Sequence, residues 1–214
     1  MRRLLKIYLL LSSIFVFSGC SISKYNHHNC DKIVLNETFI EPVINYSSVL
    51  KYNASVDVLK NHLTGLLIVK QTDSITKHLV FVTELGMKMF DFEVKNNQIN
   101  TAYIFEPLNK PKMVDALKRN FSDMFMLSGF GNNDCKYETT NEIIYTSKRN
   151  KTKHCFIVSK TAGLTTQETF HKQKKTTKIN YSYNAITKTY SQIKCKQYGL
   201  IKFYFELNEP QIVQ

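Results

Sequence analysis

The chain has 214 residues, and its 29 Lys and Arg against 17 Asp and Glu give a formal net charge of +12. With 43% hydrophobic residues, seven Gly and four Pro, the composition excludes a disordered tail, a collagen-like fibre and a polytopic membrane protein. The length suits one domain or two small ones. The excess of positive charge is concentrated in residues 129–214, where basic residues outnumber acidic ones by 14 to 6.

The first twenty residues indicate export. A basic start over residues 1–6 precedes an apolar run over residues 7–17 and then Ser18, Gly19 and Cys20. The run is shorter than the roughly 20 residues that a membrane-spanning helix needs, and its layout is typical of a secretory signal peptide. Residues 17–20 resemble the bacterial lipobox, whose cysteine is acylated and starts the mature chain. An ordinary signal peptide followed by a coincidental cysteine is the alternative.

The lipobox resemblance implies three segments and a location. These are a signal peptide over residues 1–19, a polar tether over residues 20–32 that begins at the lipidated Cys20, and a single domain over residues 33–214. Several acyl chains at about 0.8 kcal/mol per buried CH₂ anchor a protein firmly. Because Ser21 rather than Asp follows the cysteine, the enterobacterial sorting rule favours the outer membrane. We therefore expect a lipid-anchored envelope protein that faces the periplasm.

The cysteine count fits an oxidising compartment. With Cys20 set aside for lipid, Cys30, Cys135, Cys155 and Cys195 remain as an even set, which allows three disulfide pairings. Burial as small hydrophobes is the alternative for some of them. No pair has the C-x-x-C spacing typical of zinc sites, so we expect neither a metal nor a cofactor.

Short extended runs follow the tether. We predict strands over residues 32–41, 49–59, 65–70, 77–84, 86–95 and 99–105, separated by polar turns. Alternation places Phe90, Phe92 and Val94 on one face of the strand at 86–95, which is the pattern of a half-buried strand.

One helix is predicted, over residues 111–127. Pro111 suits a first helical turn, and Met113, Leu117, Phe121 and Met124 recur at helical spacing, so their apolar stripe must pack against the sheet. Further strands are predicted over residues 142–147, 153–159, 163–170, 176–183, 188–195 and 199–207. In the last of these, alternation places Ile201, Phe203, Phe205 and Leu207 on one face. The total is about 10–11 strands, and the absence of strand–helix alternation favours antiparallel pairing.

Two basic clusters lie between predicted strands and are interpreted as hairpin loops. Their members are Lys148, Arg149, Lys151 and Lys153 in the first, and Lys172, Lys174, Lys175 and Lys178 in the second. Contact with anionic lipid head groups, worth about 1 kcal/mol per charge, is one interpretation. Solvated loops that keep the protein soluble are the other. Nucleic acid is not an expected partner, because the lipobox places the chain where nucleic acid is scarce.

The strand and helix layout is similar to that of the LolA/LolB lipoprotein carriers. The motif is a Gly-led strand at residues 65–69, then a strand that closes on Gly86 and opens a second strand containing Phe90. The resemblance implies a mainly β (α+β) fold: a strongly curved antiparallel sheet, or unclosed half-barrel, with a helix across its concave face. It also implies that acyl chains bind between the sheet and the helix.

Eight apolar residues are the candidates for lining such a lipid pocket, although a plain hydrophobic core requires the same residue types. They are Phe81, Phe90, Phe92, Phe105, Leu117, Phe121, Phe203 and Phe205. No local catalytic signature is present, so we expect no enzymatic activity. The sequence favours an anchored lipoprotein that binds an acyl chain or lipidated cargo, with lipid or lipoprotein transport to the outer membrane as one expected role. A structural or adaptor lipoprotein with a solid β core, docking protein partners in the envelope, is the alternative.

Overall fold

A computed structural model describes residues 31–32, 49–58, 61–73, 75–96, 98–127, 135–184, 186–187, 189–199 and 201–213. The chain divides into two compact units, residues 1–30 and 31–214, and every described residue belongs to the second. The predicted signal peptide, Cys20 and Cys30 therefore lie outside the described residues.

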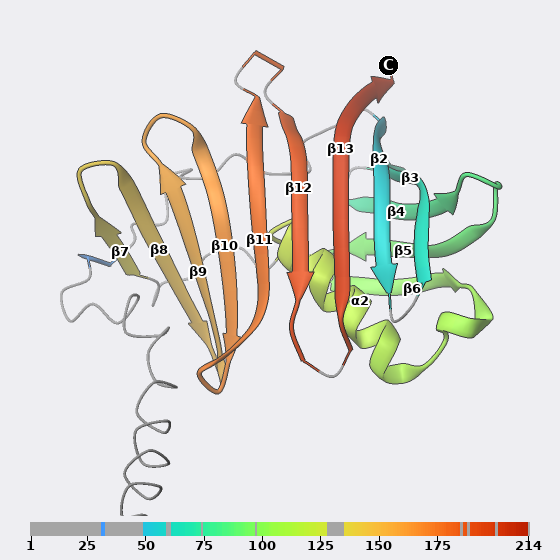
Figure 1. Cartoon of the computed structure of the whole chain (residues 1–214), viewed down its shortest axis with the longest axis horizontal. Helices are drawn as coiled ribbons and strands as arrows, with labels where there is room; N and C mark the ends of the chain where they lie inside the picture. The colour runs from blue at the N-terminus through green and yellow to red at the C-terminus, as the bar shows by residue number, and fades with distance from the viewer. Residues whose placement is uncertain are drawn as a thin grey trace, which may run out of the picture. The chain divides into compact units, whose positions relative to one another are not determined.

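The second unit is built on one antiparallel sheet (Figure 1). Its strands are β1 Asp31–Lys32, β2 Val49–Val58, β3 Asn61–Gln71, β4 Thr76–Thr83, β5 Lys88–Lys95, β6 Gln98–Ile104, β7 Cys135–Glu138, β8 Glu142–Arg149, β9 Thr152–Ser159, β10 Gly163–His171, β11 Lys174–Asn184, β12 Thr189–Gln197 and β13 Phe203–Val213. Their order is β1-β7-β8-β9-β10-β11-β12-β13-β2-β3-β4-β5-β6. Because β1 and β6 do not pair with each other, the described sheet is open, as predicted.

The sheet follows from alternating hydrophobicity. In β2, every second residue from Leu50 to Val58 is buried while the residues between them are exposed or half-buried. The predicted faces of β5 and β13 are also confirmed, since Phe90, Phe92 and Phe205 are all buried. Successive side chains of a strand point to opposite faces, so one face of the sheet carries most of the core. We call this the inner face and its opposite the outer face.

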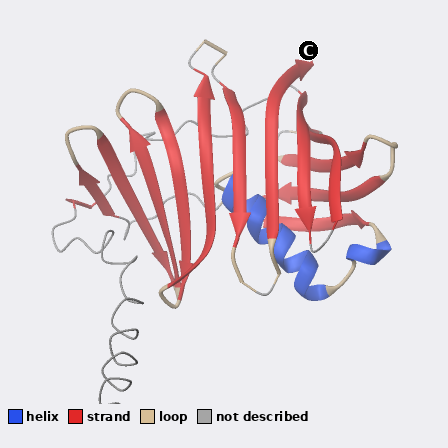
Figure 2. Ribbon diagram, in the orientation of Figure 1, coloured by secondary structure: helices blue, strands red, loops and turns tan. Residues whose placement is uncertain are grey.

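The one α-helix among the described residues, α2, spans Pro111–Met124 and lies beside the sheet, preceded by the 3₁₀ turn η3 over Glu106–Leu108 (Figure 2). Pro111 occupies its first turn, as expected, and no side chain caps its N-terminus. The predicted apolar stripe is buried and packs against the inner face. Within the described residues, no helix is long and apolar enough to span a membrane.

The sheet curves strongly around α2. In sheet order, β13 and β5 are four steps apart, a separation of about 19 Å if the sheet were flat. Yet the Phe121 ring of α2 lies 5.1 Å from the ring of Phe90 on β5 and 5.3 Å from that of Phe205 on β13. Both contacts are possible only because β2–β5 fold over the helix.

Gly65 permits the close approach of β3 and β4 in this curved region. It pairs with Thr83, and a Cβ atom on Gly65 would overlap the backbone carbonyl oxygen of Val82. Glycine kinks of this kind are a general means of curving a sheet.

The predicted strands from residue 49 onward are present, and the sheet contains more strands than the predicted 10–11. The described sheet has 13, because each of the twelve predicted runs contains at least part of a strand and the short strand β7 was not predicted. The predicted strand at residues 32–41 is described only at β1, and its remainder lies outside the described residues.

Candidate functional site

The structure brings the predicted pocket residues together between the inner face and α2. Seven of the eight are buried: Phe81, Phe90, Phe92, Leu117, Phe121, Phe203 and Phe205. Phe105 is half-buried at the start of η3, where it packs against the edge of this core.

These side chains pack on one another. The Phe90 ring stacks on that of Phe92 at 4.7 Å and lies 5.7 Å from that of Phe81, while Phe203 stacks on Phe205 at 5.7 Å. Aromatic pairs in this distance range are favourable beyond the area they bury. With α2 in place, the candidate pocket is therefore a packed aromatic core in which the helix fills the concave face.

A polar seam holds the C-terminal half of α2 against the inner face of strands β9–β12. The Asn120 amide donates to Gln197 Oε1 on β12 at 2.5 Å. On β10, the Thr169 hydroxyl donates to Asp123 Oδ2 at 3.0 Å, and His154 Nδ1 on β9 lies 3.6 Å from Asp123 Oδ1. Buried polar groups need such partners, so these bonds fix the helix in register with β9–β12.

Asp123 is the most strongly perturbed carboxylate of this seam. Only 12% of its side chain is exposed, and burial raises its pKa to about 7 from an ordinary 3.8, against the lowering effects of the Thr169 hydrogen bond and the Arg119 charge. Close to neutral pH the carboxyl is thus near its titration midpoint, beside the ring of His154.

Tyr181 completes the seam at the end of the helix. Its hydroxyl lies 3.0 Å from Gln167 Oε1, 3.1 Å from the Met124 carbonyl and 3.4 Å from the Asp123 carbonyl, three acceptors that share its one proton. Burial raises the pKa of this hydroxyl far above its ordinary value, so it stays protonated and donates to a helix-end carbonyl that would otherwise lack a partner.

Among the described residues, two buried hydroxyls of the inner face lack a hydrogen-bond partner. They belong to Tyr52 on β2 and Ser147 on β8. Tyr52 pairs with Leu67 on β3, within the apolar part of the core, and burial raises its pKa to about 12. An unpaired buried hydroxyl costs free energy, so both hydroxyls lower the stability of the folded chain.

Asn120, Asp123 and His154 were not predicted from the sequence as site residues. A usable signal existed for Asn120, which follows Met113 and Leu117 at helical spacing and so falls on the apolar stripe. Asp123 and His154 carry no such signal, because their proximity depends on how α2 crosses the sheet.

The disulfide prediction is wrong for two cysteines. Cys155 and Cys195 are free and buried, on strands β9 and β12, which are three steps or about 14 Å apart in the sheet. Disulfides need Cα atoms within about 7 Å. Burial as small apolar residues, the alternative interpretation, applies to both, and burial raises the thiol pKa of Cys155 to about 12. Cys135 is disulfide-bonded, and its partner lies outside the described residues.

A separate pocket of about 580 Å³ opens at β13, β2, β3 and the β4–β5 turn. Its lining includes Asn53, Thr64, Leu66, Glu84 and Asn208. None of the eight predicted pocket residues contributes to it. Among the described residues, no group of three or more His, Cys, Asp or Glu could hold a metal ion.

The fold thus defines a class: an open antiparallel sheet curved around one helix. No family model matches the chain, and no curated protein matches it. Among solved structures, a LolA superfamily protein from Nitrosomonas europaea matches with a TM-score of 0.48 and 8% identity, over 78% of this chain and 86% of that one. A DUF1329 family protein from Desulfovibrio piger matches with a TM-score of 0.42 and 10% identity, over 77% and 85%. Likeness at this level carries no argument about function, which has to come from the chain's own residues.

Proposed function

We propose that the chain is a lipid-anchored envelope protein that binds an acyl chain or lipidated cargo between its inner face and α2, without catalysing a reaction. The supporting observation is that a single amphipathic helix fills the apolar interior. Displacement of α2 would uncover a continuous trough of rings from β4, β5 and β13: Phe81, Phe90, Phe92, Phe203 and Phe205.

An acyl chain is a suitable occupant for this trough. The helix residues that fill it are apolar, with Leu117, Phe121 and Met124 nearly completely buried, and a hydrocarbon chain replaces such contacts by burial and dispersion alone. The polar seam holds only one end of the helix, so the end near Pro111 is the part that we expect to move.

An introduced tryptophan tests this proposal, because the chain has none. In Phe121→Trp, the indole is the sole tryptophan fluorophore and sits in the interior. Vesicles whose phospholipid acyl chains carry bromine should quench it, whereas a matched Tyr103→Trp, on the 40%-exposed site of β6, should show only collisional quenching at the surface. Equal quenching of the two variants, with native mass spectrometry finding no bound lipid, would exclude acyl-chain binding in the interior.

The membrane anchor needs its own test, since it rests on the lipobox. Replacement Cys20→Ala should leave the chain unacylated while its circular dichroism stays unchanged. Mass spectrometry of the mature N-terminal peptide reads the acylation directly. An unmodified Cys20 in the native chain would contradict the anchor and leave the interior site untouched.

A second candidate, a non-catalytic adaptor with a solid core, is favoured by exposed apolar side chains at the β4–β5 turn. Leu85 is 92% exposed, Met87 is 43% exposed, and Leu66 beside the same turn is 41% exposed. Exposed apolar clusters mark protein docking sites. A photo-crosslinking residue at position 85 should then capture a discrete envelope partner, while the equally exposed Ile186 at another turn serves as the control. The same adducts at both positions would argue against an adaptor surface.

A further inference from the structure

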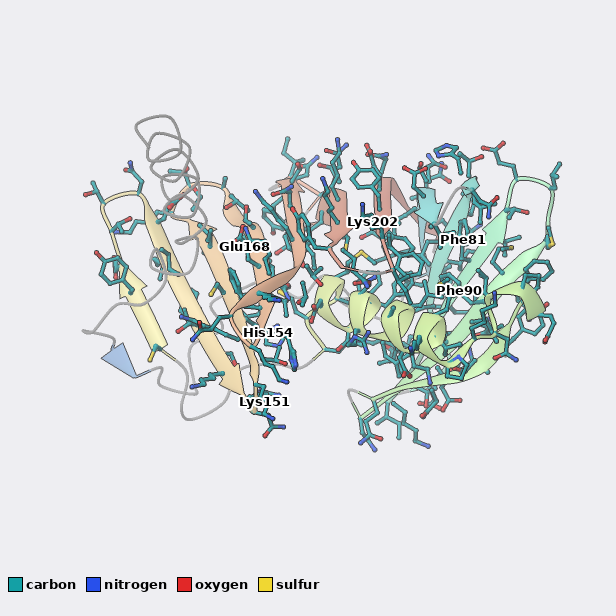
Figure 3. All side chains as sticks on the ribbon, turned by 60° about the horizontal axis from the view of Figure 1, so that its bottom comes forward. Phe81, Phe90, Lys151, His154, Glu168 and Lys202 are labelled. Atoms are coloured by element: carbon teal, nitrogen blue, oxygen red, sulfur yellow. The ribbon has the colours of Figure 1, made fainter. Side chains whose placement is uncertain are left out.

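The two basic clusters of the sequence form one surface. The β8–β9 turn and the β10–β11 turn lie together at the same end of the sheet (Figure 1), and the Lys172 backbone N–H donates to the Lys151 carbonyl at 2.9 Å. His171 also pairs with Thr152. Residues about twenty positions apart in sequence thus present their charges side by side, with Lys151 at the tip in Figure 3.

The segment of the chain that carries these turns is strongly basic in sequence. Between Glu142 and Glu206 the sequence contains 13 Lys and Arg and one acidic residue, Glu168. Glu168 is already engaged, since the Lys175 ammonium lies 2.7 Å from its Oε1. We define the cationic end as Lys148, Arg149, Lys151, Lys153, Lys172, Lys174, Lys178 and Lys196.

Like charges oppose one another directly at two places in the cationic end. Lys148 pairs with Lys153 across β8 and β9, and Lys178 pairs with Lys196 across β11 and β12. Both pairs project from the outer face, because the next residues along their strands face α2. His154 lies beside Asp123 and Gln197 accepts from Asn120, and they pair with Ser147 and Thr177. Like charges in register destabilise a sheet, so an anion bound at the turns would relieve this repulsion. Farther along the same strands the outer face is not open, because Cys155 and Phe170 on it are buried.

The β10–β11 turn adds a further conformational cost. Its central residues, Lys172 and Gln173, have φ of 45° and 68°, where hairpins favour Asn-Gly. A long cationic side chain is thus held at the tip in a conformation that L-residues with a Cβ disfavour.

We propose that the cationic end docks on an anionic lipid bilayer surface. Seven of its eight members are lysines, which act as point charges without the bidentate geometry of arginine, and a lipid surface requires only that. Residues 148–153 and 172–174 contain no Phe, Tyr, Trp or His on which nucleic-acid bases could stack. The inference shares only the membrane location with the proposed function, and it requires no acyl chain in the interior.

Site-directed fluorescence on the full chain tests the docking. A polarity-sensitive dye on Lys172→Cys is compared with one on Lys160→Cys, an exposed lysine of the β9–β10 turn at the opposite end of the strands. On vesicles of phosphatidylcholine with about one third phosphatidylglycerol, the dye at 172 should be at least about threefold less accessible to an aqueous quencher than on pure phosphatidylcholine. The dye at 160 should show no difference. Raising the salt from about 0.1 to 0.5 M should abolish the protection.

Charge removal supplies the decisive control. Lys151→Gln with Lys174→Gln should abolish the protection at 172, because two of the nearest charges are lost. The Cys20→Ala chain added to preformed vesicles should show the same lipid dependence. This variant therefore distinguishes loss of the membrane anchor from loss of docking. Equal accessibility on both vesicle types would overturn the proposal. Stronger protection by a single-stranded oligonucleotide than by anionic vesicles would also overturn it and would assign the surface to nucleic acid.

Discussion

Replacement Asp123→Asn should make the protein's stability less dependent on pH between pH 5 and 8. The amide keeps the size of the carboxyl, can accept from Thr169 and donate toward His154, and cannot ionise. In the native chain, burial holds the pKa of Asp123 at about 7 rather than 3.8, so the folded state retains a proton that the unfolded state has lost.

The sign and size follow from proton linkage. This group's contribution to stability is complete below pH 3.8 and falls by about 1.4 kcal/mol per pH unit until the native carboxyl ionises near pH 7. The wild-type chain should therefore lose about 2–3 kcal/mol of unfolding free energy between pH 5 and 8 through Asp123 alone. Carboxylates with lowered pKa values, such as Glu138 and Glu206, lose their contribution only at more acidic pH.

Urea unfolding at pH 5, 6, 7 and 8 provides the measurement. From pH 5 to pH 8, the unfolding free energy of Asp123→Asn should rise relative to that of the wild-type chain by about 2–3 kcal/mol. Asp115→Asn, on the exposed side of the same helix, is the matched control and should parallel the wild-type chain. If Asp123→Asn and wild type differ by a constant amount across this pH range, the raised pKa of Asp123 is wrong.

Three further outcomes follow from single sites. Tyr52→Phe should leave the unfolding free energy unchanged or raise it by up to about 1 kcal/mol, because the lost hydroxyl has no partner within the described part of the chain; a clear decrease of the unfolding free energy in urea would show that this hydroxyl is hydrogen-bonded in the folded chain. Gly65→Ala should destabilise by more than about 3 kcal/mol, since its Cβ meets the backbone of β4, whereas Gly86→Ala, with φ of +80° and open space around it, should cost about 1 kcal/mol in the same assay. Cys155 and Cys195 should resist maleimide labelling until the chain is unfolded, because both thiols are buried; rapid labelling of the native chain would contradict their placement.

Local pattern was sufficient to predict most elements of the fold. The period of two in β5 and β13 and the helical spacing around Leu117 and Phe121 each describe which side of an element is apolar, and burial of those sides is observed. The strand β7 has only four residues and too few alternations to be recognised. β3 begins at Asn61, before the predicted run, and β13 begins at Phe203 and ends at Val213, both later than predicted. The added residues pair with β2 through backbone hydrogen bonds, which hydrophobic alternation does not reveal.

The sequence predicted which residues line the interior, but not whether that interior is empty or filled. Alternation identified the rings of Phe90, Phe92 and Phe205 as inward-facing, yet a core and a pocket require the same residues. Only the ring distances to Phe121 show that α2 fills the interior.

By itself, the sequence determined the periodicities, the uneven positive charge and the number of cysteines, because each of these depends on residues close together in the chain. Tertiary structure decided which distant residues meet: Asp123 with His154, one basic turn with the other, and Cys155 apart from Cys195. The physical reason is that pairing order and sheet curvature bring together residues whose separation in sequence carries no information about their separation in space.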